Sequence, residues 1–130
     1  MTAVPGTVHE ITLRVTPDLT ADVLGNPGVP VLATPSLITL LENTCSQLMR
    51  PLPAGAATVG TMVEMKHLAA TPVGHTVRAR ATLLETDGRR YLFAVEAWDD
   101  REKIAEGRHE RFLVADLQKF LARVMKKADV

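Results

Sequence analysis

The sequence has 130 residues, so we expect one domain spanning residues 1–130. Hydrophobic residues make up 46% of the chain and charged residues 23%, which excludes a disordered or low-complexity protein. Fifteen basic and fifteen acidic side chains give a formal net charge of zero, which argues against a nucleic-acid partner. The single cysteine, Cys45, excludes an internal disulfide and favours a reducing, cytoplasmic compartment. No stretch reaches the roughly 18 apolar residues of a membrane span, so we expect no membrane partner.

The first part of the chain predicts a strand, a long loop and a helix. Thr7 to Val15 alternates polar and apolar residues, which indicates a short strand. Residues 17–30 are rich in glycine and proline and predict a loop. A helix should begin at Thr34-Pro35, with Thr34 as its N-cap, and end at Arg50-Pro51. Apolar residues at helical spacing form one stripe along it: Leu37, Leu40, Leu41, Cys45, Leu48 and Met49.

The rest of the chain predicts strands over residues 58–68, 76–83, 91–97 and 103–114, followed by a short helix that begins at Asp116. Asp87-Gly88 is typical of a hairpin turn. Consecutive strands joined by short turns favour an antiparallel sheet, and therefore an α+β fold. A curved antiparallel sheet wrapped around one long helix is the hotdog fold, which usually forms dimers; this step is an analogy between folds.

Four positions could carry chemistry, and each also has a purely structural interpretation. Glu42 lies at the edge of the apolar helix stripe. It is either a partly buried, reactive carboxylate or a residue that marks the border between the stripe and solvent. His67 ends a strand and could be an acid, a base or a hydrogen-bonded structural residue. Thr34 is a helix N-cap at an end whose free N–H groups could also polarise a carbonyl. Gly60, inside a strand, marks a bulge or the close approach of a ligand.

The remaining candidates are weaker. Arginines on the later strands could bind the phosphates of a coenzyme, although most such residues form a solvated sheet face: Arg78, Arg80, Arg89, Arg90, Arg108 and Arg111. Cys45 fits the packed helix stripe better than it fits a nucleophile. The other histidines are scattered, and the sequence has no HExxH pattern, so we predict no metal site.

Several segments then follow one another in a recognisable order. They are Ala33-Thr34-Pro35, Leu41-Glu42, Val59-Gly60-Thr61, residues 67–74, Asp87-Gly88-Arg89-Arg90 and His109-Glu110-Arg111. This ordered set resembles the fluoroacetyl-CoA thioesterase-like family of hotdog proteins, from about Val31 to Phe120. The resemblance implies an acyl-CoA thioester hydrolase that needs no cofactor, because CoA is part of its substrate.

The resemblance also implies residue roles. Thr34, Glu42 and His67 match the family's catalytic set, and Gly60, Thr61, Ala69 and Arg111 match positions near the substrate. Glu42 would attack the thioester carbonyl or activate a water, His67 would assist with protonation or positioning, and Thr34 would orient the carboxylate. A backbone N–H near Gly60 would help to hold the oxyanion.

Regular geometry keeps these residues apart within one chain. In a straight helix Thr34 and Glu42 would lie about 12 Å apart. In an extended strand Gly60 and His67 would lie about 23 Å apart and on opposite faces. We therefore expect either a bend before Glu42 or, more simply, a homodimer with its sites at the interface. The alternative function is a hotdog dimer that binds an acyl-CoA or a related ligand without turning it over. A hydratase would need an Asp/His pair in one helix region, which the sequence lacks.

The sequence departs from the fluoroacetyl-specific pattern before the helix. The family's fluoroacetyl-specific member carries phenylalanines in this loop, whereas the first aromatic residue of this chain is Tyr91. Asn43 also replaces an aromatic residue after the glutamate. We therefore expect a small or medium acyl-CoA other than fluoroacetyl-CoA as substrate.

Overall fold

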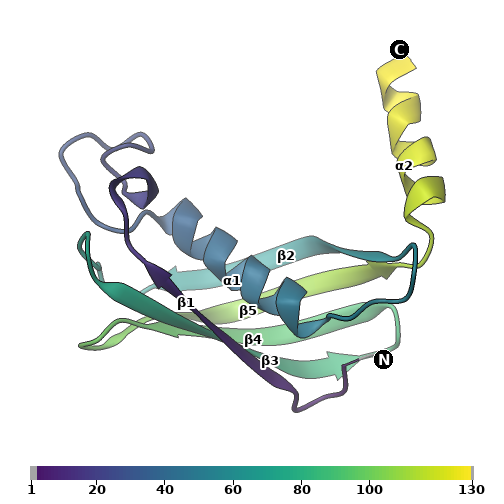
Figure 1. Ribbon diagram of the computed structural model, residues 1–130, viewed down its shortest axis with the longest axis horizontal. Helices are drawn as coiled ribbons and strands as arrows, with labels where there is room; N and C mark the ends of the chain where they lie inside the picture. Colours follow the sequence, from purple (N-terminus) through teal and green to yellow (C-terminus); the bar gives the residue numbers. More distant parts are fainter. Residues whose placement is uncertain (1–2, 130) are drawn as a thin grey trace.

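The computed structural model describes residues 3–129, and its five strands form one antiparallel sheet (Figure 1). The strands are β1 (Val8–Arg14), β2 (Ala57–His67), β3 (Thr76–Thr86), β4 (Arg90–Trp98) and β5 (Lys103–Val114). Their order across the sheet is β1-β3-β4-β5-β2, so β1 and β2 are the two edges. The helices are α1 (Thr34–Leu48) and α2 (Leu117–Met125), with short 3-10 turns at Pro17–Leu19 and Lys126–Asp129. The predicted element order is confirmed.

The core lies between α1 and the sheet, which curves around the helix (Figure 1). The predicted helix stripe is buried, and the alternation predicted for residues 76–83 and 91–97 is confirmed by the inward-facing residues of β3 and β4. Those residues are each at most 1% exposed: Val77, Ala79, Ala81, Leu83, Tyr91, Phe93, Val95 and Ala97. Burying one large apolar side chain contributes roughly 1.5–3 kcal/mol, so this contact fixes α1 against the sheet.

The edge strand β2 contains a β-bulge. Its pairing with β5 shifts register between Gly60 and Met62, so Thr61 is an extra residue in the strand. One extra residue reverses the alternation of side chains beyond it. Gly60 and His67 therefore both face α1, and the expectation that they lie on opposite faces is wrong. The sequence interpretation of Gly60 as a bulge position is confirmed.

The long loop before α1 is held in place by backbone and side-chain hydrogen bonds. The N–H of Leu32 donates to the Thr71 carbonyl at 2.8 Å, and the Asp22 carboxylate accepts the N–H of Gly28 at 2.6 Å. Val15 and Leu32 are fully buried. These contacts set the position from which α1 begins.

Helix α2 projects away from the sheet (Figure 1). Its N-cap is Asp116, as predicted, and the Asp116 carboxylate accepts the N–H of Lys119 at 3.0 Å. The predicted apolar stripe of α2 has no buried residue, and Leu121, Val124 and Met125 are 45%, 42% and 60% exposed. No helix of residues 3–129 combines the length and the apolar character that crossing a bilayer requires.

Candidate functional site

Thr34 and His67 meet at the start of α1. The N-cap of α1 is Ala33, and Thr34 is the first helical residue, with no side-chain capping bond. The predicted N-cap role of Thr34 is therefore wrong. Its hydroxyl oxygen instead lies 2.9 Å from Nδ1 of His67, the last residue of β2. Helix α1 and β2 thus present this hydroxyl–imidazole pair together.

The second ring nitrogen of His67 has no partner. Nε2 is buried, and no group among the described residues hydrogen-bonds to it. Burial lowers the pKa of His67 below its usual value, an effect that the backbone of Ala69 partly offsets. The imidazole is therefore neutral at pH 7, and it can give or take one proton at Nε2. Ala69 itself packs against the core.

Glu42 stands over the backbone of Gly60. The Glu42 side chain is 38% exposed, at the border of the apolar stripe on α1. A Cβ added at Gly60 would collide with Oε2 of Glu42 and would lie 3.0 Å from His109 Cε1. The absence of a side chain at Gly60 is therefore what lets a carboxylate reach the strand backbone.

His109 and Arg111 extend from β5 toward the same carboxylate. His109 is 1% exposed, and its Nε2 lies 3.6 Å from Glu42 Oε2. Its Nδ1 lies 2.8 Å from the carbonyl oxygen of Met62, which can only accept, so Nδ1 carries the proton. Nε2 then accepts from Nη1 of Arg111 at 3.1 Å. Burial lowers the pKa of His109, so this ring is also neutral at pH 7.

Arg111 is fixed by β2. Its Nε donates to Thr58 Oγ1 and its Nη2 to the Thr58 carbonyl, both at 3.0 Å. The Arg111 side chain is 9% exposed, and its Nη1 lies 3.9 Å from Glu42 Oε2. Arg111 therefore places a permanent positive charge opposite the Glu42 carboxylate.

The predicted residues form two groups rather than one. Thr34 pairs with His67, and Glu42 pairs with Gly60, each pair within one chain. Thr61 donates instead to the carboxylate of Glu110, at 2.7 Å. Analysis of the sequence missed His109 as a neighbour of Glu42. Its position two residues before Arg111 on a strand puts both on one face, and this spacing could have identified it.

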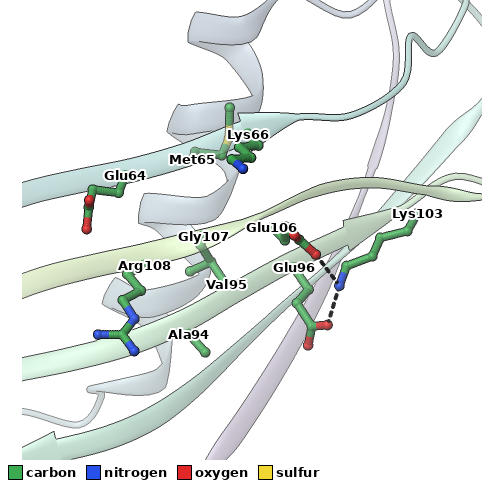
Figure 2. Close-up of a pocket in the computed structure, with 10 residues that line it drawn as sticks. All are labelled: Glu64, Met65, Lys66, Ala94, Val95, Glu96, Lys103, Glu106, Gly107 and Arg108. Atoms are coloured by element: carbon green, nitrogen blue, oxygen red, sulfur yellow. Dashed lines mark ion pairs between the residues drawn. The ribbon is translucent and has the colours of Figure 1, made fainter.

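Cys45 is buried, and burial raises the pKa of its thiol to about 12, so it is not a nucleophile at pH 7. Within residues 3–129 no three metal-ligating side chains gather into a site. A hollow of about 610 Å³ on the outer face of the sheet, the face away from α1, is shown in Figure 2. There Lys103 already bridges Glu96 and Glu106, at 3.0 and 2.9 Å.

Comparison with known proteins places the chain in a family. Residues 15–116 match the family described as fluoroacetyl-CoA-specific thioesterase. The fluoroacetyl-CoA thioesterase of Streptantibioticus cattleyicolor is 40% identical over 98 residues, which cover 75% of this chain and 70% of that protein. A solved structure of a fluoroacetyl-CoA thioesterase aligns with a TM-score of 0.89 and 34% identity over 98% of both chains.

A hot-dog-like protein from Thermanaerovibrio acidaminovorans has the same fold. It aligns with a TM-score of 0.86 at 22% identity, over 95% of this chain and 91% of that one. The hotdog fold expected from the element order is therefore confirmed. On the family match and the 40% identity, this chain belongs to the fluoroacetyl-CoA-specific thioesterase family.

Proposed function

We propose that the protein hydrolyses a small or medium acyl-CoA to the free acid and CoA, with Glu42 in the bond-breaking step and Thr34 and His67 assisting. The observation that carries this assignment is the position of the Glu42 carboxylate against the backbone of Gly60. A thioester held at that backbone would have a carboxylate within reach of its carbonyl carbon, and a thioester hydrolase needs such a nucleophile or base.

Glu42 can act by two routes, a covalent route and a direct route. In the covalent route a carboxylate oxygen bonds to the thioester carbon, the C–S bond breaks, and the CoA thiolate takes up a proton. Water then hydrolyses the acyl-glutamate anhydride. In the direct route Glu42 accepts a proton from water while the water oxygen attacks the carbon; the C–S bond then breaks, and the departing CoA thiolate takes up a proton. Backbone N–H groups near Gly60 would stabilise the oxyanion in either route.

The neighbours of Glu42 suit both routes. Arg111 keeps a positive charge 3.9 Å from the carboxylate, and His109 is a neutral acceptor that orients this guanidinium. A neutral His67 can take up a proton from water at one ring nitrogen while Thr34 holds the other, and the protonated ring can then deliver this proton to the departing sulfur.

Relatives support a small acyl group. Solved structures of fluoroacetyl-CoA thioesterase variants hold fluoroacetate with CoA in one case and acetyl-CoA in another. The loop before α1 in this chain carries no aromatic side chain, so it lacks the phenylalanines that the fluoroacetyl-specific member carries there. We therefore infer that the substrate is a small or medium acyl-CoA other than fluoroacetyl-CoA.

A homodimer would join the two groups of site residues. Among residues 3–129, strand β2 is an edge that pairs only with β5, so its outer backbone groups could pair with a second copy. A two-fold axis through Glu64 would set Val63 opposite Met65 of the partner subunit, and would set the bulge residues Gly60 and Thr61 opposite His67 of the partner subunit. Directly opposite residues of an antiparallel pair share a face, and here that is the face toward α1. Glu42 would then meet the partner's His67, whose buried Nε2 has no hydrogen-bond partner among residues 3–129 of its own chain.

The first experiment measures release of free thiol from short, medium and aromatic acyl-CoAs. Wild type should turn over at least one of them, and Glu42→Gln should lose this activity. Glu102→Gln, at an exposed turn, is the matched control and should behave as wild type. Binding without turnover by the wild type would establish the alternative function, a non-catalytic acyl-CoA-binding dimer. Equal turnover in wild type and Glu42→Gln would refute the role of Glu42.

A subunit-mixing experiment tests the shared site. Glu42→Gln and His67→Asn chains are unfolded together and refolded as a mixture. If each site takes Glu42 from one chain and His67 from the other, a mixed dimer regains one intact site. Random pairing then restores about a quarter of the wild-type activity. If both residues came from one chain, mixing two inactive variants would restore nothing.

A further inference from the structure

Strand β5 holds the bulge of β2 from both faces of the sheet. On the face toward α1, Nδ1 of His109 donates to the carbonyl of Met62, the residue directly after the bulge, at 2.8 Å. On the outer face, the Thr61 hydroxyl donates to Oε1 of Glu110 at 2.7 Å. His109 and Glu110 are neighbours on β5, so their side chains point to opposite faces. Two consecutive residues of β5 therefore hold two consecutive residues of β2, one from each face.

The carboxylate of Glu110 is itself held by β4. Its second oxygen, Oε2, accepts from Nε of Arg90, the first residue of β4. The Glu110 side chain is 17% exposed. Hydrogen bonds from Thr61 and from Arg90 lower the pKa of the Glu110 carboxyl below its usual value, so this group is ionised at pH 7. Hydrogen bonds to an ionised group are the stronger kind, so Glu110 connects the bulge firmly to an interior strand of the sheet.

The backbone ladder alone does not hold Thr61. Among residues 3–129, Thr61 has no partner in the register of β2 with β5, and β2 is an edge strand. If the bulge moved one residue toward the start of β2, Gly60 and Thr61 would both oppose Arg111, which faces α1. The Thr61 side chain would then turn to the face toward α1, beside the Glu42 carboxylate. The hydrogen bond to Glu110 opposes this shift, because it requires Thr61 on the outer face.

We propose that Glu110 is a positioning residue for thioester hydrolysis that acts from the face of the sheet opposite Glu42. By holding Thr61 on the outer face, Glu110 fixes the bulge, and the bulge fixes the backbone of Gly60 against the Glu42 carboxylate. This inference rests on the proposed function and adds to it a residue that touches no reacting group. It also gives Thr61 a role other than the substrate contact that the family resemblance implies.

The kinetic test removes each half of the Thr61–Glu110 hydrogen bond. Thr61→Val keeps the shape of the side chain and Glu110→Met keeps its length, but each loses the polar group. In both variants kcat for the best acyl-CoA should fall about tenfold, and KM should change less than about twofold, because neither side chain faces the substrate. Thr61→Ser keeps the hydroxyl and should keep the wild-type kcat. Glu106→Met, on the same strand and face as Glu110, is the matched control and should behave as wild type.

A double-mutant cycle distinguishes positioning from contact with the substrate. If Thr61 acts through Glu110, the variant Thr61→Val/Glu110→Met should lower kcat about as much as either single change. Effects that multiply, to about a hundredfold, would show that the two residues act separately and would overturn the inference. If Glu110→Met fails to fold, the contrast between Thr61→Val and Thr61→Ser carries the test, and equal kcat in these two variants overturns the inference.

A spectroscopic test does not depend on turnover. The Nδ1 proton of His109 is buried and bonded to the Met62 carbonyl, so it should give a slowly exchanging imidazole resonance, assigned by its loss in His109→Asn. This resonance should shift or weaken in Thr61→Val and in Glu110→Met. Absence of hydrolysis by the wild type would refute the proposed function, but the resonance would still test the control of the bulge by Glu110. An unchanged resonance in both variants, its absence from the wild type, or wild-type kcat in both variants would overturn the inference.

Discussion

Gly60→Ala tests whether contact between Glu42 and the strand backbone matters for the reaction. The new Cβ would collide with Glu42 Oε2 and would lie 3.4 Å from Arg111 Nη1. The flexible end of Glu42 must retreat by about 1 Å to reach an ordinary van der Waals separation. A misplacement of this size can lower turnover about 100-fold.

The fold should tolerate this change. Gly60 does not have a positive φ, so alanine fits its backbone. Alanine reduces the entropy of the unfolded chain, which stabilises the fold by about 0.4–1 kcal/mol. Moving the Glu42 side chain off its preferred rotamer costs about 0.5–1.5 kcal/mol. The two effects nearly cancel, so the free energy of unfolding should change by less than about 1 kcal/mol.

The assay pairs kcat/KM for the best acyl-CoA with denaturant unfolding, and a second glycine provides the contrast. A Cβ at Gly107 would collide with the backbone carbonyl oxygen of Glu64, which cannot move without disturbing β2. Gly107→Ala should therefore destabilise the sheet by about 2 kcal/mol or more, while Gly60→Ala keeps its stability and loses activity. Wild-type kcat/KM in a well-folded Gly60→Ala variant would refute the reasoning.

Three further predictions concern the neighbouring groups. Arg111→Lys cannot reproduce the hydrogen bonds to Thr58, and should lower the free energy of unfolding by about 1–3 kcal/mol in denaturant titrations; an unchanged midpoint would contradict it. His67 and His109 have lowered pKa values when folded, so below about pH 6.5 the unfolded chain binds more protons and stability falls with falling pH. A melting temperature that does not fall between pH 7 and pH 5 in the wild type, or that falls equally in a His67→Asn/His109→Asn variant, would count against this. Cys45 should resist iodoacetamide at pH 8 in the native protein and react on unfolding, because burial raises the pKa of its thiol to about 12; rapid native labelling, followed by mass spectrometry, would disprove it.

The elements were predictable because their patterns are local. Alternation identified β3 and β4, helical spacing identified α1, and the Asp116 cap identified the start of α2. The cap of α1 was assigned one residue late, because threonine and proline fit either of the first two positions of a helix. The Thr34 hydroxyl is hydrogen-bonded to His67, which lies 33 residues further along the chain. No local pattern contains such a contact.

The exposure of the apolar stripe of α2 could not be predicted from the sequence, for a different reason. Period and hydrophobicity indicate that a helix has an apolar face, but they do not state what covers it. In this chain the sheet covers the apolar face of α1, whereas Leu121, Val124 and Met125 of α2 stay exposed. Composition alone does not separate these two cases.

The bulge in β2 explains why the geometry of a regular strand placed Gly60 and His67 on opposite faces. An unbroken strand would turn His67 away from α1 and out of reach of Thr34. The extra residue, Thr61, restores both Gly60 and His67 to the face toward α1. The carbonyl of Met62, directly after the bulge, accepts the Nδ1 proton of His109 and leaves Nε2 to accept from Arg111. One inserted residue therefore sets both the facing of the site residues and the tautomer of the histidine beside Glu42.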